Sequence, residues 1–170
     1  MKCILFLLAI NFSSAQINIF DCARSGTVEE IEVLYHSNPK VIDSLDSRGS
    51  SPLTLAAYHN NIGVVNFLIE KVETINGNSS EGSPLMGAVV KGHTEVVSIL
   101  INAGANPNLT DANGTTALHY AVMFKNHIIT ALLIEADADI NIKNNVDQSP
   151  LDFAKIYDDE KLNQILYILK

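Results

Sequence analysis

The sequence predicts an all-α fold, a solenoid of about four to five stacked helix-turn-helix units. A Ser/Thr-x-Leu triplet recurs at spacings of 32, 33 and 33 residues, and an alanine lies five residues after each start. Periods of this length are typical of repeat architectures. Hydrophobic residues make up 47% of the 170 residues, which is enough for a continuous core. The triplets begin at Ser51, Ser83, Thr116 and Ser149.

The first helix of each unit is expected to begin directly after this Ser or Thr. Its hydroxyl can accept a hydrogen bond from an unpaired backbone N–H at the helix start. Proline follows in three of the four units, at Pro52, Pro84 and Pro150, where a helix needs no N–H. A first helix over residues 52–59 then carries two alanines, whose small size lets neighbouring units stack closely.

The second helix of each unit is expected to follow a tight turn. The turns are predicted around residues 60–61, at Gly92 and at residues 125–126. The apolar stripe that follows needs a neighbouring unit to cover it, so stability comes from stacking. The second helices are predicted over residues 63–71, 94–103 and 127–136, and a segment such as 76–82 is expected to project toward the next unit.

The chain divides into a short leader and one repeat domain. Residues 1–15 hold a positive start, an apolar run from Cys3 to Ile10, and small residues at Ser13 and Ala15, the order of a secretory signal peptide. The alternative is a buried first helix. The apolar run is too short for a stable membrane anchor, so we expect it to be removed. The mature chain would then cover residues 16–170, carry a formal charge of −9 and have no membrane span. Its units are 16–45 (an N-terminal cap), 46–78, 79–110, 111–143 and 144–170 (a C-terminal cap).

The repeat resembles that of the ankyrin family. The unit beginning at Asp111 carries Gly114, Thr116, Leu118 and His119 in the family's order, and residues 91–97 read KGHTEVV. The resemblance covers about residues 18–170. It implies a protein that binds another protein on its concave surface, which is made by the projecting turns and the solvent side of the first helices.

Some residues depart from the family pattern. Glu81 and Asp147 stand where a glycine is expected, at a position that wants a left-handed backbone. Only His119 keeps the histidine that usually follows the first-helix leucine. Cys22, the single thiol of the expected mature chain, aligns with a small buried residue of the repeats and is therefore expected to be a core residue.

The resemblance also implies which residues meet a partner. The two first-helix positions that follow the alanine pair are mostly aromatic or large and apolar here. Aromatic residues carry much of the energy at interfaces. The alternative is that about half of these side chains pack between repeats. The candidates are Tyr58, His59, Val90, Lys91, Met123, Phe124, Ile156 and Tyr157, with Arg48 and Asn113 on the turns; Ser47, Ser50, Ser80, Gly82, Ala112, Thr115, Val146 and Gln148 complete the expected turn tips.

The sequence offers no pattern for chemistry. The five histidines have no metal-ligand spacing, no nucleophile motif or phosphate loop is present, and no cofactor is expected. Asp158 to Glu160 form an acidic run that we interpret as a solvated helix start. Because nucleic-acid binding needs clustered Lys and Arg, the net charge of −8 argues against it.

The leading functional hypothesis is therefore an exported, non-catalytic binding module, periplasmic or secreted, that scaffolds, protects or inhibits another protein. The partner could be an exported enzyme such as a catalase, a toxin or a host protein. The acidic net charge mildly favours a basic target. The alternatives are a structural envelope protein without a dedicated partner and, least favoured, an enzyme.

Overall fold

The computed structural model describes residues 18–77 and 82–168 and confirms the all-α solenoid. The predicted signal peptide, Ser80 and Glu81 lie outside these ranges. Within them each named element is a helix, and Thr110 and Thr116 form an isolated β-bridge. The helices are α1 (Ile19–Ser25), α2 (Val28–Ser37), the short 3-10 helix η1 (Pro39–Asp43), α3 (Pro52–Tyr58), α4 (Ile62–Ile69), α5 (Pro84–Lys91), α6 (Thr94–Asn102), α7 (Ala117–Met123), α8 (His127–Glu135), α9 (Pro150–Tyr157) and α10 (Glu160–Ile168).

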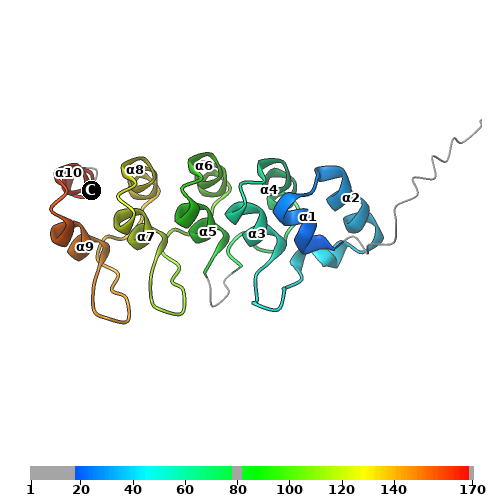
Figure 1. Cartoon of the computed structure of the whole chain (residues 1–170), viewed down its shortest axis with the longest axis horizontal. Coiled ribbons are helices and arrows are strands. Elements are labelled where there is room, and N and C mark those ends of the chain that lie inside the picture. The colour runs from blue at the N-terminus through cyan, green and yellow to red at the C-terminus, as the bar shows by residue number, and fades with distance from the viewer. Residues whose placement is uncertain (1–17, 78–81, 169–170) are drawn as a thin grey trace, which may run out of the picture.

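The helices form two parallel layers, with long loops projecting from one side (Figure 1). The odd-numbered helices form an inner row, in which α1, α3, α5, α7 and α9 contact one another in chain order. The even-numbered helices form an outer row that packs on the inner one. The loops extend from the inner row on the side away from the outer helices, so loops and inner helices share a surface that faces solvent.

The predicted helix starts are confirmed by their capping hydrogen bonds. The hydroxyls of Ser51, Ser83, Thr116 and Ser149 each accept from the backbone N–H three residues later. The helices end one or two residues earlier than predicted. The last residues of the expected ranges, such as His59 and Ala103, are C-cap residues outside the helix.

The core lies between adjacent units, as the repeat pattern predicts. The small residues Ala56 and Ala57 of α3 are fully buried, and so are Val64, Val65 and Leu68 of α4. The same positions are buried in the α5–α6 and α7–α8 pairs, which makes one continuous cluster. Cys22 is buried as predicted, and burial, followed by the nearby carboxylates of Glu30 and Asp21, raises the pKa of its thiol.

Asparagines at the ends of the units join each repeat to the next. The Asn76 side-chain oxygen accepts from the backbone N–H of Asn106 at 2.8 Å. In the next unit, the Asn108 side chain accepts from Asp139 N–H at 2.7 Å and donates to the Asp137 carbonyl at 3.0 Å. These bonds cross from one unit to its neighbour and therefore fix the stacking register.

Asp147 adopts the left-handed backbone that its position predicts. Its φ is +61°, against +80° for Gly49 and +70° for Gly114 at the equivalent positions. The predicted tight turns between first and second helices behave likewise, since Asn60, Gly92 and Lys125 all have positive φ. An L-residue with a side chain pays a conformational cost there that glycine does not.

Candidate functional site

Four of the predicted binding residues line one groove on the loop side of the inner helices. The groove has a volume of about 640 Å³ and runs from the loop at residues 46–50 across the ends of α1, α3 and α5 to α7. Arg48 comes from the loop, Tyr58 and His59 from the end of α3, and Val90 from α5. The other residues around it are Arg24, Asp46, Ser47, Ser50, Thr54, Leu55, Ser83, Gly87 and Tyr120.

Asp46 holds the loop that carries Arg48. Its Oδ1 accepts from the backbone N–H groups of Arg48 and Ser50, both at 2.9 Å, and its Oδ2 lies 3.4 Å from the Arg24 guanidinium. Burial favours the neutral acid, but these hydrogen bonds and the charge of Arg24 outweigh it and hold the pKa of Asp46 below its ordinary value. The loop is therefore positioned by an ionised carboxylate.

Tyr58 and Lys91 meet across neighbouring units. The Lys91 ammonium lies 4.9 Å from the centre of the Tyr58 ring, within cation–π range. Tyr58 is 38% exposed, and Val90 beside it is half-buried. His93 Nε2 lies 3.1 Å from the Tyr58 carbonyl, which ties the turn after α5 to the end of α3. The ring thus presents one face to Lys91 while remaining accessible.

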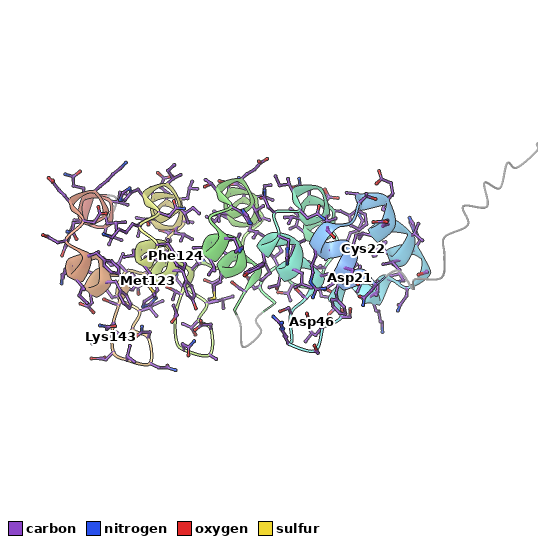
Figure 2. The ribbon with its side chains drawn as sticks, in the orientation of Figure 1. Asp21, Cys22, Asp46, Met123, Phe124 and Lys143 are labelled. Carbon is purple, nitrogen blue, oxygen red and sulfur yellow. The ribbon has the colours of Figure 1, made fainter. Side chains whose placement is uncertain are left out.

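Phe124 and Met123 continue this surface at the end of α7, where Figure 2 labels them. Phe124 is 56% exposed and Met123 37%. The Phe124 ring stacks on Tyr120 at 6.4 Å, with 14° between the ring planes, and Tyr120 lines the groove. The Tyr120 hydroxyl donates to Asp111 Oδ2 at 2.6 Å. Burial and this carboxylate raise the pKa of Tyr120 to about 12.

Ile156 and Tyr157 lie apart from the groove, in the last unit. Ile156 is 63% exposed at the end of α9. Tyr157 is half-buried, stacks on Phe153 and lies 5.4 Å from the Lys125 ammonium. Its surroundings are a shallow depression with acidic residues Asp158, Asp159 and Glu160 on its rim. The predicted row of helix-end residues therefore has two different electrostatic settings.

The predicted turn tips are only partly exposed. Arg48 and Asn113 are exposed as expected, and the Asn113 carbonyl also accepts from Asn145 N–H of the next loop at 2.9 Å. The prediction was wrong for Ser50 and Thr115, which are buried, because their N–H groups bond inward to Asp46 and Asp111. Gly82 is buried as well, and Gln148 is half-buried because its carbonyl faces His119; Ser47, Ala112 and Val146 are exposed.

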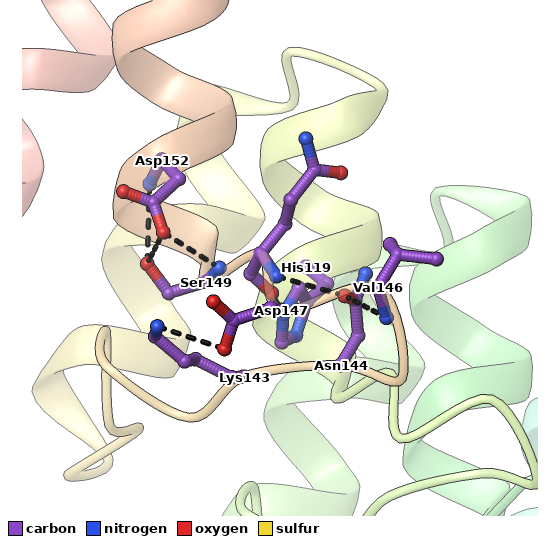
Figure 3. Close-up of polar contacts among 8 residues, drawn as sticks. His119, Lys143, Asn144, Val146, Asp147, Ser149 and Asp152 are labelled. Atoms are coloured by element: carbon purple, nitrogen blue, oxygen red, sulfur yellow. Dashed lines mark hydrogen bonds and ion pairs between the residues drawn. The ribbon is translucent and has the colours of Figure 1, made fainter.

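The loop at residues 144–148 shows how these turns are built (Figure 3). Asn144 Oδ1 accepts from Val146 N–H at 3.1 Å and from Gln148 N–H at 3.0 Å, and Lys143 pairs with Asp147 at 2.9 Å. The next helix begins with a reciprocal capping pair between Ser149 and Asp152. Asp152 thus occupies the helix position that His119 occupies in the preceding unit, and its side chain caps the start of its own helix.

Arg24 and Tyr120 are among the groove residues that sequence analysis did not name as partner contacts. Arg24 follows the Cys22–Ala23 pair of the N-terminal cap as Tyr58 follows Ala56–Ala57, so aligning the cap with the repeats points to it. Tyr120 lies four residues before Phe124 and hence on the same helix face. Arg24 therefore occupies the first of the two positions per unit that the family resemblance implies, whereas Tyr120 occupies neither.

Residues 18–77 and 82–168 contain no group of three or more His, Cys, Asp or Glu side chains arranged to hold a metal ion. Within the same ranges, each helix is too short or too polar to cross a membrane. His127 and Asp159 form a pair at 3.1 Å, and Asp159 also caps α10 through Leu162 N–H, so this pair has a structural role.

Comparison with known proteins gives the same family throughout. The model for ankyrin repeats (three copies) matches residues 19–111 and 85–168. A putative ankyrin repeat-containing protein of Treponema pallidum is 32% identical over 119 residues, which is 69% of this chain and 40% of that protein. The probable 26S proteasome regulatory subunit p28 of Saccharomyces cerevisiae is 30% identical over 143 residues, 81% of this chain and 63% of that protein.

A putative palmitoyltransferase, ZDHHC13 of Danio rerio, is 29% identical over 157 residues, 90% of this chain but only 24% of that protein. The chain thus spans between a quarter and two thirds of the length of these three relatives. What they share with it is the repeat array. With the family model covering most of its length, the chain belongs to the ankyrin-repeat family, whose repeats are protein–protein interaction modules and typically carry no catalysis.

Proposed function

We propose that this chain is an exported, non-catalytic binding module that holds another protein on the face made by its loops and inner helix ends. The observation that carries the proposal is the exposure of large apolar side chains at equivalent positions of successive units. Tyr58, Met123, Phe124 and Ile156 are all exposed at the ends of inner helices. Exposed apolar clusters of this kind are typical of interaction sites.

The arrangement favours a protein partner over a small molecule. The groove is open to solvent and is lined by residues of the N-terminal cap and of three successive repeats. Other side chains support the aromatic rings in it and beside it. Tyr120 supports Phe124, and Lys91 covers one face of Tyr58. Rings held in place lose little conformational entropy on binding, which makes them efficient contact residues.

The export part of the proposal is supported by residues 1–15 alone. Their positive, apolar and small-residue order is that of a secretory signal. Amino-terminal sequencing of the protein recovered from its source cells tests it. We expect a first residue of Gln16 in the periplasmic or secreted fraction; an intact Met1 in the cytosolic fraction would contradict export.

Capture of the partner tests the binding function. The chain from residue 16, which retains every described element, is tagged and used to pull down proteins from the envelope fraction of its source. A matched pair of variants separates the two faces. Tyr58→Ala with Phe124→Ala removes apolar area beside the loops, and Val33→Ala with Ile128→Ala removes exposed apolar area from outer helices α2 and α8.

We expect a stoichiometric partner that the Tyr58/Phe124 variant loses and the Val33/Ile128 variant keeps, with the melting temperatures of both close to that of the parent. A partner kept by the first variant and lost by the second would place the site on the outer helices. Self-association without any partner would favour the alternative of a structural envelope protein.

A further inference from the structure

Charge is distributed unevenly between the two helix layers. The chain has a formal net charge of −8, yet helices α3, α5 and α7 of the inner row contain no Asp or Glu. Outer helix α2 alone contains three glutamates, and α6, α8 and α10 contain one each. The overall negative charge therefore does not describe the surface where the inner helices end.

The groove itself carries basic side chains. Arg24 and Arg48 line it together with the imidazole of His59, and Lys91 lies over the Tyr58 ring at its edge. Among the residues that the structure describes, Asp46 is the single acidic residue in its lining, and the Asp46 oxygens already accept from two backbone N–H groups and Arg24. No described carboxylate lies within ion-pair distance of Arg48 or Lys91.

The pKa of His59 reflects the same cationic neighbours. Burial lowers the pKa of His59, and the charges of Arg24, Lys91 and His93 lower it further. Arg24 comes from the N-terminal cap and already pairs with Asp21 and Asp46, whereas Arg48 and Lys91 come from two successive repeats and have no described carboxylate within ion-pair distance. Cations without a described counter-charge favour an anionic ligand.

We infer that this groove binds an acidic segment of the partner protein, with its carboxylates on Arg48 and Lys91 and a neighbouring apolar side chain against Tyr58 and Val90. The inference rests on the proposed binding function and gives the chemistry of the partner. Guanidinium groups match carboxylates in geometry as well as charge. The net charge of the chain taken alone favoured a basic target; the local charges of the groove favour the opposite.

Selection from a random library of 12-residue peptides displayed on phage tests the inference with the chain from residue 16 as bait. Non-specific attraction to a bait of formal charge −9 enriches basic peptides, so an enrichment of Asp and Glu has to come from a local cationic site. We expect peptides rich in Asp and Glu beside one aromatic or aliphatic residue. Enrichment of basic or uncharged peptides, or of none, would overturn the inference.

A matched pair of charge reversals locates the binding site of the selected peptides. Arg48→Glu with Lys91→Glu reverses two cations of the groove, and Lys40→Glu with Lys71→Glu makes the same change in total charge away from it. Lys71 is a close match for Lys91, because its ammonium also lies over an aromatic ring, 4.9 Å from the centre of Phe67. We expect the first variant to weaken peptide binding at least about 30-fold and the second less than about 3-fold, since each close charge pair contributes about tenfold. Equal losses would overturn the inference.

The captured partner distinguishes this inference from the binding function on which it rests. A partner that is lost with the Tyr58/Phe124 variant but binds the Arg48/Lys91 reversal as tightly as the parent would support the binding function and refute the acidic segment. A chain that captures no partner would refute the binding function itself, whatever peptides the library selection yields.

Discussion

Asp46 and Asp111 occupy the same position in two loops, and each uses one carboxylate oxygen identically. Oδ1 accepts from the backbone N–H groups two and four residues later in both loops, at 2.8 to 2.9 Å. The second oxygens differ. Asp46 Oδ2 faces the Arg24 guanidinium at the rim of the groove, whereas Asp111 Oδ2 accepts from the Tyr120 hydroxyl (Figure 2 labels Asp46).

The difference extends to the whole of the two repeats. The unit from Asp111 directs its polar side chains at its neighbours: His119 bonds to the Gln148 carbonyl of the next loop, and His127 pairs with Asp159. The unit from Asp46 has Thr54 and Leu55 where the other has His119 and Tyr120, and it leaves Arg48 exposed. One unit bonds His119 and His127 to its neighbour, whereas the other leaves Arg48 exposed, where we propose that a partner binds.

The largest effect should follow from removing His119. His119 is fully buried; Nδ1 accepts from Thr116 N–H at 3.0 Å, so Nε2 donates to the Gln148 carbonyl at 3.0 Å. His119→Ala leaves both groups unpaired beside a cavity and should lower the free energy of unfolding by about 3 to 5 kcal/mol. Urea unfolding measures it. His93→Ala, which removes a half-buried contact with the Tyr58 carbonyl, should cost far less; equal losses would remove the contrast between the repeats.

Tyr120→Phe should destabilise the chain by about 1 to 2 kcal/mol, because the charged Asp111 oxygen loses its donor at 2.6 Å. Tyr167→Phe, which alters an exposed hydroxyl, is the control. The raised pKa of Tyr120, about 12, means that the folded state favours the neutral phenol. The stability that comes from this preference is lost as pH rises above about 10, which is the pKa of a free tyrosine. Absorbance titration should show the same tyrosine ionisation near pH 10 in the parent and in Tyr120→Phe. The parent should then show one further tyrosine ionising near pH 12.

Acid should weaken the stack through His119. Burial lowers the pKa of His119 more than the Gln148 carbonyl and Asp111 raise it, so the fold prefers the neutral ring. The stabilisation is complete above the unfolded pKa of about 6.5 and is lost as pH falls below it. Urea midpoints at pH 7.5 and 5.0 should differ more for the parent than for His119→Gln. His59, whose pKa is also lowered, contributes equally to both chains and cancels.

The smallest effect concerns Lys125, which has φ of +52° where the preceding repeat has Gly92 at +72°. Lys125→Gly should remove the conformational cost of a left-handed backbone at an L-residue, but glycine loses more backbone entropy on folding. The net result should be a free energy of unfolding higher by about 0.5 to 1 kcal/mol. Asn60→Gly, at the same turn position, should gain less because Asn tolerates this backbone better. A loss of stability in Lys125→Gly would mean that its contact with the Tyr157 ring matters more than the backbone.

The repeat pattern predicted the fold because spacing, caps and small residues are local features. The N-caps, the buried Cys22 and the left-handed Asp147 all follow from position within the repeat. The groove did not follow, because its lining comes from several units and its charge depends on which carboxylates are already bonded. Ser50 and Thr115 were misplaced for a similar reason, since an inward-facing aspartate draws their N–H groups into the loop.

Amide hydrogen exchange of the chain with and without its captured partner tests the central claim most directly. The account predicts added protection at the loops 46–50 and 111–115 and at the ends of α3, α5 and α7, with outer helices α4 and α6 unchanged. Added protection confined to the outer helices, or spread evenly over all units, would contradict binding on the loop side of the inner row.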